Sequence, residues 1–263
     1  MFAEVDRHGS IVGFGPHNGQ DLTDVIHIPK GSFILPTFCD LHLHAPQFLY
    51  QGTGLHLPLM KWLNEYAFKA EEKLDADQDL AERVYRRLAR RLIESGTGAV
   101  SLFGTIKEET KSVVSFHSVG EVFIADSEFD RPLVSLILAK VMKEAGLRAF
   151  IGKLSMDTSS RSSYVEPSAE ASLDSARSFA EKCYALDEAE GSQLIEPILT
   201  PRFVPTCSDA LLHGLGEIAA QGRNSIPLRI QSHLAESEDQ VAWVKSTRHA
   251  DDIDVFDKVR SLL

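Results

Sequence analysis

Strand-like and helix-like segments alternate along most of this chain, and this alternation limits the folds that it can adopt. Five short apolar segments are predicted as strands: 33–41, 99–103, 148–154, 194–200 and 228–232. Amphipathic segments separate them, and the predicted helices are 57–70, 78–93, 136–146, 168–185, 208–220 and 237–245. Strands that alternate with helices of this length form βα units, so the pattern predicts an α/β fold with a parallel sheet.

The segment 78–93 is the clearest of the predicted helices. Apolar residues recur at every fourth position from Leu80 to Leu92, which places them on one face of a helix. Asp77 is the predicted N-cap, and Gly96 is the predicted stop at the C-terminal end.

A parallel sheet of this kind can close into a (β/α)8 barrel, whose active site lies where the strand ends meet the following loops. The predicted strands supply about five of the eight βα units, so we expect a partial TIM-type barrel over residues 33–263. A smaller open sheet is the alternative, because an unclosed barrel exposes an unpaired edge. Residues 1–32 are expected to be the remnant of a small β element, with strand-like pieces at 11–12 and 25–28.

Composition and charge argue against several classes of partner. Lysine and arginine number 27 against 38 aspartate and glutamate residues, without a basic run, so nucleic acid is not an expected partner. The most apolar stretch is too short to span a membrane, and the first residues lack the pattern of a signal peptide. We therefore expect a cytoplasmic protein with no membrane partner. The three cysteines are widely spaced, so a zinc site would have to be built from histidines.

His42 and His44 follow directly on the first predicted strand. Side chains two positions apart in a strand point to the same face, so the two imidazoles would converge. His233 ends the fifth predicted strand, and in a barrel all three histidines would face the same mouth. Three neutral imidazoles suit Zn²⁺. The alternative is that these are ordinary surface or core histidines.

Glu236 follows His233 by three residues. A carboxylate beside a zinc ion can move the proton of a water molecule that the metal activates. The alternative role is structural, because an acid in the first turn of the following helix interacts favourably with the helix dipole. Taken alone, the position of Glu236 favours this structural role.

Several motifs resemble those of a known family. The segment from Leu35 to Gln47, Leu-Pro-Thr-Phe-Cys-Asp-Leu-His-Leu-His-Ala-Pro-Gln, resembles the first-strand signature of the amidohydrolase superfamily. Segments 57–66, 150–157, 200–203 (Thr-Pro-Arg-Phe) and 231–236 (Gln-Ser-His-Leu-Ala-Glu) are similar to its guanine deaminase branch. The resemblance covers most of residues 5–110 and 138–258.

The resemblance implies zinc-dependent hydrolytic deamination of guanine to xanthine and ammonia. The implied zinc ligands are His42, His44 and His233, and the implied proton carrier is Glu236. The implied substrate contacts are His44, Gln47, Arg202, Phe203 and His233. Without the resemblance, Arg202 would be interpreted as part of a surface salt bridge and Phe203 as a core aromatic residue. Trp62 and Tyr66 are expected to pack within the fold rather than to touch substrate.

The chain also departs from the family's pattern. Relatives continue with a sixth strand ending in His-Gly and an eighth ending in an aspartate, and neither is found here. We therefore expect that three βα units are missing and that the isolated chain is catalytically impaired. Residues 1–32 correspond to only part of the family's small β-sandwich domain. Lys107 stands where relatives commonly have histidine. Residues 111–134 have no counterpart in the relatives, and either a surface insertion or an unspliced stretch would explain this segment.

Two other interpretations stay open. The chain could be a sister amidohydrolase that acts on another nucleobase, S-adenosylhomocysteine or a chlorotriazine, although Gln47 and the Arg202–Phe203 pair favour guanine. It could also be a non-catalytic fragment that pairs with a full-length subunit through its open barrel edge. The resemblance is to proteins that form homodimers, so a homodimer is a further expectation.

Overall fold

The computed structural model describes residues 2–7, 10–16, 25–107, 134–188 and 194–260, and it divides into two compact units, Met1–Pro36 and Thr37–Leu263. The first unit contains one antiparallel pair, β1 (Phe2–Val5) and β2 (Ile11–Gly15). The prediction of a strand at 11–12 is confirmed by β2. The prediction of a strand at 25–28 was wrong. These residues form no ladder within the described part of this unit, and the side chain of Ile26 is exposed. The segment 111–134 lies outside the described residues, except for Val134.

A parallel sheet forms the centre of the second unit. Its strands are β3 (Phe38–His44), β4 (Thr97–Phe103), β5 (Arg148–Gly152) and β7 (Ile195–Pro197), in the order β3-β4-β5-β7. Every neighbouring pair is parallel, which confirms the predicted α/β class.

The first strand begins later than predicted and includes both histidines. Residues 33–36 are exposed and belong to no strand, and the hydrogen bonding starts where the Phe38 N–H donates to the Gly96 carbonyl at 2.8 Å. Pro36 has no N–H to contribute to a ladder, so the apolar residues 33–35 do not join the strand that their composition predicted.

Three of the predicted strands are interrupted or missing. The segments 148–154 and 194–200 each divide in two, and their second halves form a short parallel pair, β6 (Leu154–Ser155) with β8 (Thr200–Pro201). The predicted fifth strand, 228–232, is not formed. Two isolated parallel bridges occur instead, Leu199 with Ile230 and, just beyond this segment, Phe203 with His233, and they are supported by backbone hydrogen bonds to residues 199 and 202.

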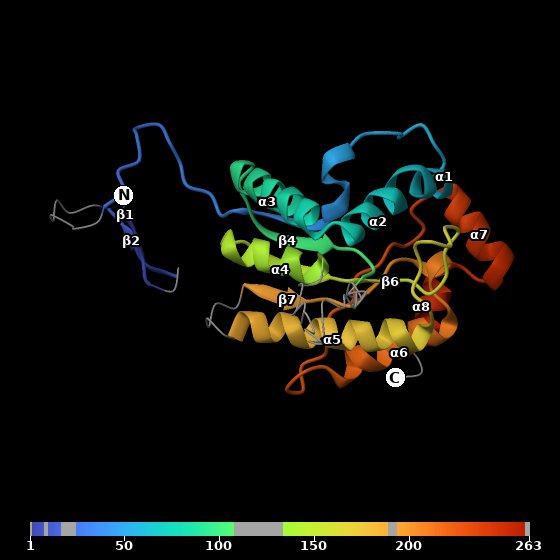
Figure 1. Ribbon diagram of the computed structural model, residues 1–263. Coiled ribbons are helices and arrows are strands. Elements are labelled where there is room, and N and C mark those ends of the chain that lie inside the picture. The colour runs from blue at the N-terminus through green and yellow to red at the C-terminus, as the bar shows by residue number, and fades with distance from the viewer. Residues whose placement is uncertain (1, 8–9, 17–24, 108–133, 189–193, 261–263) are drawn as a thin grey trace, which may run out of the picture. The chain divides into compact units, whose positions relative to one another are not determined.

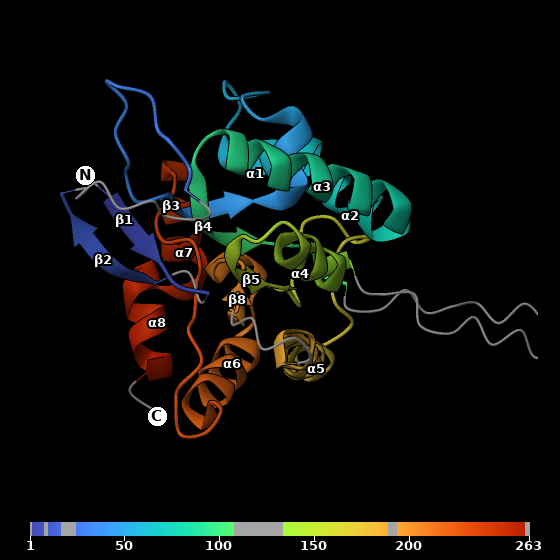
Figure 2. The same ribbon diagram turned by 90° about the vertical axis from the view of Figure 1, so that its left-hand side faces the viewer.

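Four long helices pack in chain order along one side of the sheet (Figure 2): α3 (Gln78–Glu94), α4 (Val134–Glu144), α5 (Ala169–Glu188) and α6 (Asp209–Gln221). The predicted helix 57–70 is longer than expected and runs through α1 (Leu59–Trp62), the π-helical η2 (Leu63–Ala67) and α2 (Phe68–Ala76). Figure 1 also shows α7 (Glu238–Arg248) and α8 (Asp252–Arg260), and 3-10 turns form at η1 (Ala45–Tyr50) and η3 (Val204–Thr206). No helix in these ranges is long and apolar enough to cross a bilayer.

The alternation of side chains along β4 separates the structural face of the sheet from the functional one. Val100 and Leu102 are buried in the core beneath α3 and α4. Ser101 and Phe103 lie between them in sequence and therefore point to the other face. There Ser101 donates a hydrogen bond to Gln231, and Phe103 lies against histidine rings. The helices thus cover one face, and the other face is left for polar chemistry.

The start of α3 has the predicted cap, because Asp77 Oδ1 accepts a hydrogen bond from the Leu80 N–H at 2.9 Å. The change Asp77→Ala is expected to lower the free energy of unfolding by about 1 kcal/mol, since that N–H loses its partner. Urea denaturation measures the change. The variant Asp77→Ser keeps a capping oxygen and should remain within about 0.5 kcal/mol of wild type. Equal losses in the two variants would contradict the capping role.

Candidate active site

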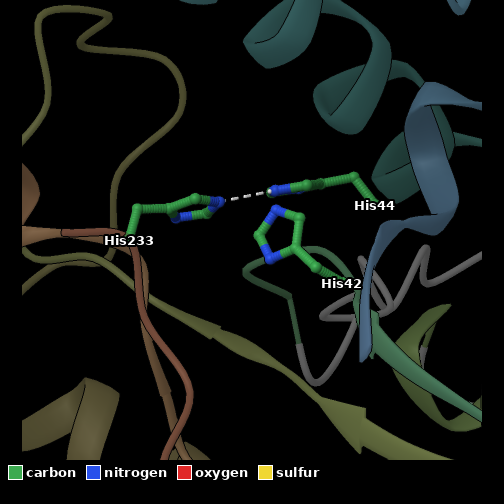
Figure 3. A group of neighbouring side chains, drawn as sticks. All are labelled: His42, His44 and His233. Carbon is green, nitrogen blue, oxygen red and sulfur yellow. Dashed lines mark hydrogen bonds between the residues drawn. The ribbon is translucent and has the colours of Figure 1, made fainter. Parts of the chain in front are cut away.

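The three histidines singled out in the sequence come together on the inner face of the sheet (Figure 3). His42 and His44 project from β3, and His233 comes from the segment that bridges to Phe203. The Nε2 atoms of His44 and His233 are 2.9 Å apart, and one ring nitrogen from each of the three residues lies within 4.8 Å of the others. Among the residues that the structure describes, no other histidine, cysteine or acid joins this group.

The backbone carbonyl of Arg202 fixes the orientation of His233. His233 Nδ1 lies 2.7 Å from this oxygen. A carbonyl can only accept, so Nδ1 carries the proton and Nε2 keeps its lone pair toward the cluster. Hydrogen bonding of one ring nitrogen in this way is typical of metal-ligating histidines.

Burial keeps two of the imidazoles neutral. Loss of solvation lowers the pKa of His44 well below its ordinary value, and it lowers the pKa of His233 to about 4. Neutral imidazole is the form that binds a metal. Two nitrogens on a tetrahedral zinc ion at about 2.0–2.1 Å would be about 3.4 Å apart. The observed spacings therefore fit a divalent ion after small side-chain adjustments.

Phe103 supports all three imidazoles. Its ring centroid lies 4.8 Å from that of His42, 4.5 Å from that of His44 and 4.7 Å from that of His233. Phe103 was not among the site residues predicted from the sequence. Its place at the carboxyl end of β4, on the same face as Ser101, was the signal that could have found it.

A cavity of about 180 Å³ opens beside the histidines. Its lining includes the predicted substrate contacts Gln47, Arg202 and Phe203, together with Glu236 at one side. Trp62 was expected only to pack, yet it also lines the cavity, while its indole N–H donates to the Thr53 carbonyl at 2.8 Å. The remaining lining residues are Leu43, Leu59 and Leu63 besides the three histidines, so polar and apolar side chains both line the cavity, as in many small-molecule sites.

Arg202 is completely buried and does not form a surface salt bridge. Its guanidinium donates to Glu71 Oε2 at 2.6 Å, and both side chains are at most 2% exposed. The guanidinium also lies over the ring of Phe68, 4.9 Å from its centroid. Phe68 and Glu71 are three residues apart on α2, so one helical face holds the arginine on two sides. Sequence reasoning missed both of these α2 residues.

Glu236 does not belong to the helix that follows it. The N-cap of α7 is Ser237, whose hydroxyl accepts from the Gln240 N–H, and the first helical residue is Glu238. The helical role considered from the sequence is therefore wrong. Partial desolvation raises the pKa of Glu236, although the nearby His42 and Arg202 oppose this change. A carboxyl group with a raised pKa is well suited to accept a proton near neutral pH.

Gln231 holds the strand ends around the site in register. Its amide nitrogen donates to the Leu102 carbonyl and to Thr200 Oγ1, and its amide oxygen accepts from Ser101. A Cβ on Gly152 would lie only 1.7 Å from Thr200 Oγ1. The absence of a side chain at Gly152 thus allows this network to form beneath the cavity.

Asp75 on α2 makes the stability of the chain depend on pH. Burial raises its pKa from 3.8 to about 7. Between these values the unfolded chain binds fewer protons at this residue than the folded chain, so the contribution of Asp75 to stability is greatest below about pH 4 and falls as the pH rises to about 7. The change Asp75→Asn removes this loss. At pH 8 it should raise the free energy of unfolding by up to about 4 kcal/mol, at about 1.4 kcal/mol per pH unit.

Urea denaturation of wild type and Asp75→Asn at pH 4 and pH 8 measures this effect. The exposed Asp257→Asn is the matched control and should give the same small change at both pH values. An equal effect of Asp75→Asn at pH 4 and pH 8 would show that burial of the charge is not the cause.

The model of the amidohydrolase family matches residues 33–262. The chain belongs to the amidohydrolase family. Two similar amidohydrolases are guanine deaminases: that of Dictyostelium discoideum is 36% identical over 87% of this chain and 43% of its own length, and that of Mus musculus is 32% identical over 89% and 45%.

A solved amidohydrolase structure has a similar fold. The crystal structure of guanine deaminase from C. acetobutylicum, described with bound guanine in the active site, matches with a TM-score of 0.68 and 31% identity. The match covers 85% of this chain and 46% of that one. The chain therefore spans less than half the length of each of these three relatives.

Proposed function

We propose that this chain acts in the zinc-dependent hydrolytic deamination of guanine to xanthine and ammonia. The observation that carries the proposal is a single cavity bounded by three converging imidazoles, by a buried arginine and by a carboxyl group with a raised pKa. The similarity to guanine deaminases supports the choice of guanine. We also propose that the open parallel sheet is a sector of a (β/α)8 barrel, in which strand ends and the following loops form the active site.

Different side chains would bind the metal, bind the purine and transfer the proton. His42, His44 and His233 would hold the zinc ion, which supplies Lewis acidity that activates water at neutral pH. Glu236 would accept a proton from water and deliver it to a ring nitrogen. Arg202 can only donate hydrogen bonds, whereas the Gln47 amide can both donate and accept. Phe203 and the leucines would exclude water around the flat base.

Zinc content, purine binding and turnover of the purified chain test this proposal. We expect one zinc per chain by elemental analysis, and saturable binding of guanine by the zinc-loaded chain. Xanthine and ammonia are measured separately, because we expect the isolated chain to bind guanine but to be impaired in its turnover. Failure to bind zinc, or failure of the zinc-loaded chain to bind guanine, would overturn the proposal. Turnover of adenine or a chlorotriazine in place of guanine would identify a different amidohydrolase activity.

A further inference from the structure

Glu71 does not line the cavity, but its carboxylate is hydrogen-bonded to Arg202, which does. One oxygen, Oε2, accepts from Arg202 at 2.6 Å, and the other, Oε1, is buried with no hydrogen-bond partner in the described ranges. A buried carboxylate of this kind is costly unless it is paired. The pairing with Arg202 therefore offsets the cost of placing Glu71 in the interior.

The contacts of Arg202 fix both its position and its plane. Glu71 holds one edge of the guanidinium, Phe68 covers one face, and the backbone of Arg202 is anchored where its carbonyl accepts from His233. An unrestrained arginine side chain has many rotamers, and immobilising it on binding costs free energy. Here this ordering is present before any ligand arrives.

We infer that Glu71 is a positioning residue, which holds the Arg202 guanidinium at the cavity wall and thereby sets a preference for guanine over adenine. This inference rests on the proposed function. Arginine has N–H donors and no acceptor. Guanine offers two neighbouring acceptors, O6 and N7, whereas adenine places an amino donor where guanine has O6. A fixed guanidinium therefore favours guanine, and a mobile one can turn away from the adenine amino group.

The test compares Glu71→Gln with Glu72→Gln in the zinc-loaded chain. Glu72 is the matched control, because it is adjacent on α2 and pairs with Arg161 instead, at 2.6 Å and away from the cavity lining. Binding is followed through the fluorescence of Trp62, which lines the cavity. The change Trp243→Phe removes the other of the two tryptophans from every variant.

For Glu71→Gln we expect guanine affinity to fall at least tenfold while adenine affinity changes less than threefold, so that the ratio of the two falls. Glu72→Gln should leave both affinities within threefold of the parent. Parallel losses for guanine and adenine, or an unchanged guanine affinity, would overturn the inference. A merely structural role of Glu71 would not change the ratio.

A second measurement separates this inference from the proposed function. The side-chain ¹⁵N resonances of Arg202, assigned by their loss in Arg202→Lys, report the mobility of the guanidinium without a ligand. We expect restricted rotation in the parent and in Glu72→Gln, and faster rotation in Glu71→Gln. Equal mobility in all three would overturn the positioning role. Failure of the parent to bind guanine would overturn the proposed function, and the resonances would still decide whether Glu71 holds Arg202.

Discussion

Replacing His44 with alanine is expected to lower the zinc affinity of the chain by at least about 100-fold. The variant removes one of three converging ring nitrogens, and histidine ligands supply a large part of zinc binding energy, which is about 10–16 kcal/mol for a complete four-ligand site. A loss of about 3 kcal/mol corresponds to roughly a 100-fold change. Competition with a chromophoric chelator measures the affinity.

The control for this result is His213→Ala, which removes an imidazole from α6 outside the cluster. It should leave the zinc affinity within about twofold of wild type, and circular dichroism should show that both variants fold. Unchanged stoichiometric zinc binding by His44→Ala would mean that the three imidazoles do not share a metal ion.

Replacing Arg202 with methionine is expected to lower the free energy of unfolding by about 3–5 kcal/mol. The loss arises because the Glu71 carboxylate stays buried without its partner. The variant Arg161→Met is the matched control, because it breaks the neighbouring pair with Glu72, in which both side chains are about 30% exposed. That pair should contribute less than about 1 kcal/mol.

The double variant Arg202→Met, Glu71→Met tests the cause. Replacing both members of a buried ion pair by apolar side chains is often neutral, so most of the stability should return. Urea denaturation of the single and double variants measures the coupling between the two residues. If the double variant is no more stable than Arg202→Met, the loss comes from packing rather than from an unpaired charge.

The order of elements could be predicted from the sequence because it depends on local patterns. The helix α3 was placed to within one residue, since Asp77 and Gly96 bound a regular apolar repeat. The strands were less well placed. Pro36 lies within the apolar run before β3, and residues 228–232 have the composition of a strand but make only isolated bridges.

The candidate site was only partly accessible to sequence reasoning. His42 and His44 are two apart in one strand, so their convergence follows from strand geometry. The end of the fifth predicted strand pointed to His233 and Glu236, and the resemblance to amidohydrolases added Gln47, Arg202 and Phe203; all five border the cavity. Glu71 is 131 residues from Arg202 in sequence, and Phe103 meets the histidines only across the sheet. Such contacts depend on tertiary packing, which no local pattern encodes.

Residue 202 contacts two parts of the site, since its carbonyl accepts a hydrogen bond from His233 while its side chain borders the cavity. Under the proposed function, a backbone displacement at this position would disturb the zinc ligand and the base contact together. Metal retention and base discrimination should therefore respond jointly to mutations that shift the Thr200–Pro201 strand. Under the proposed function, Gln47 and Trp62 are better positions at which to change the substrate range, because within the described part of the chain neither is hydrogen-bonded to the three histidines.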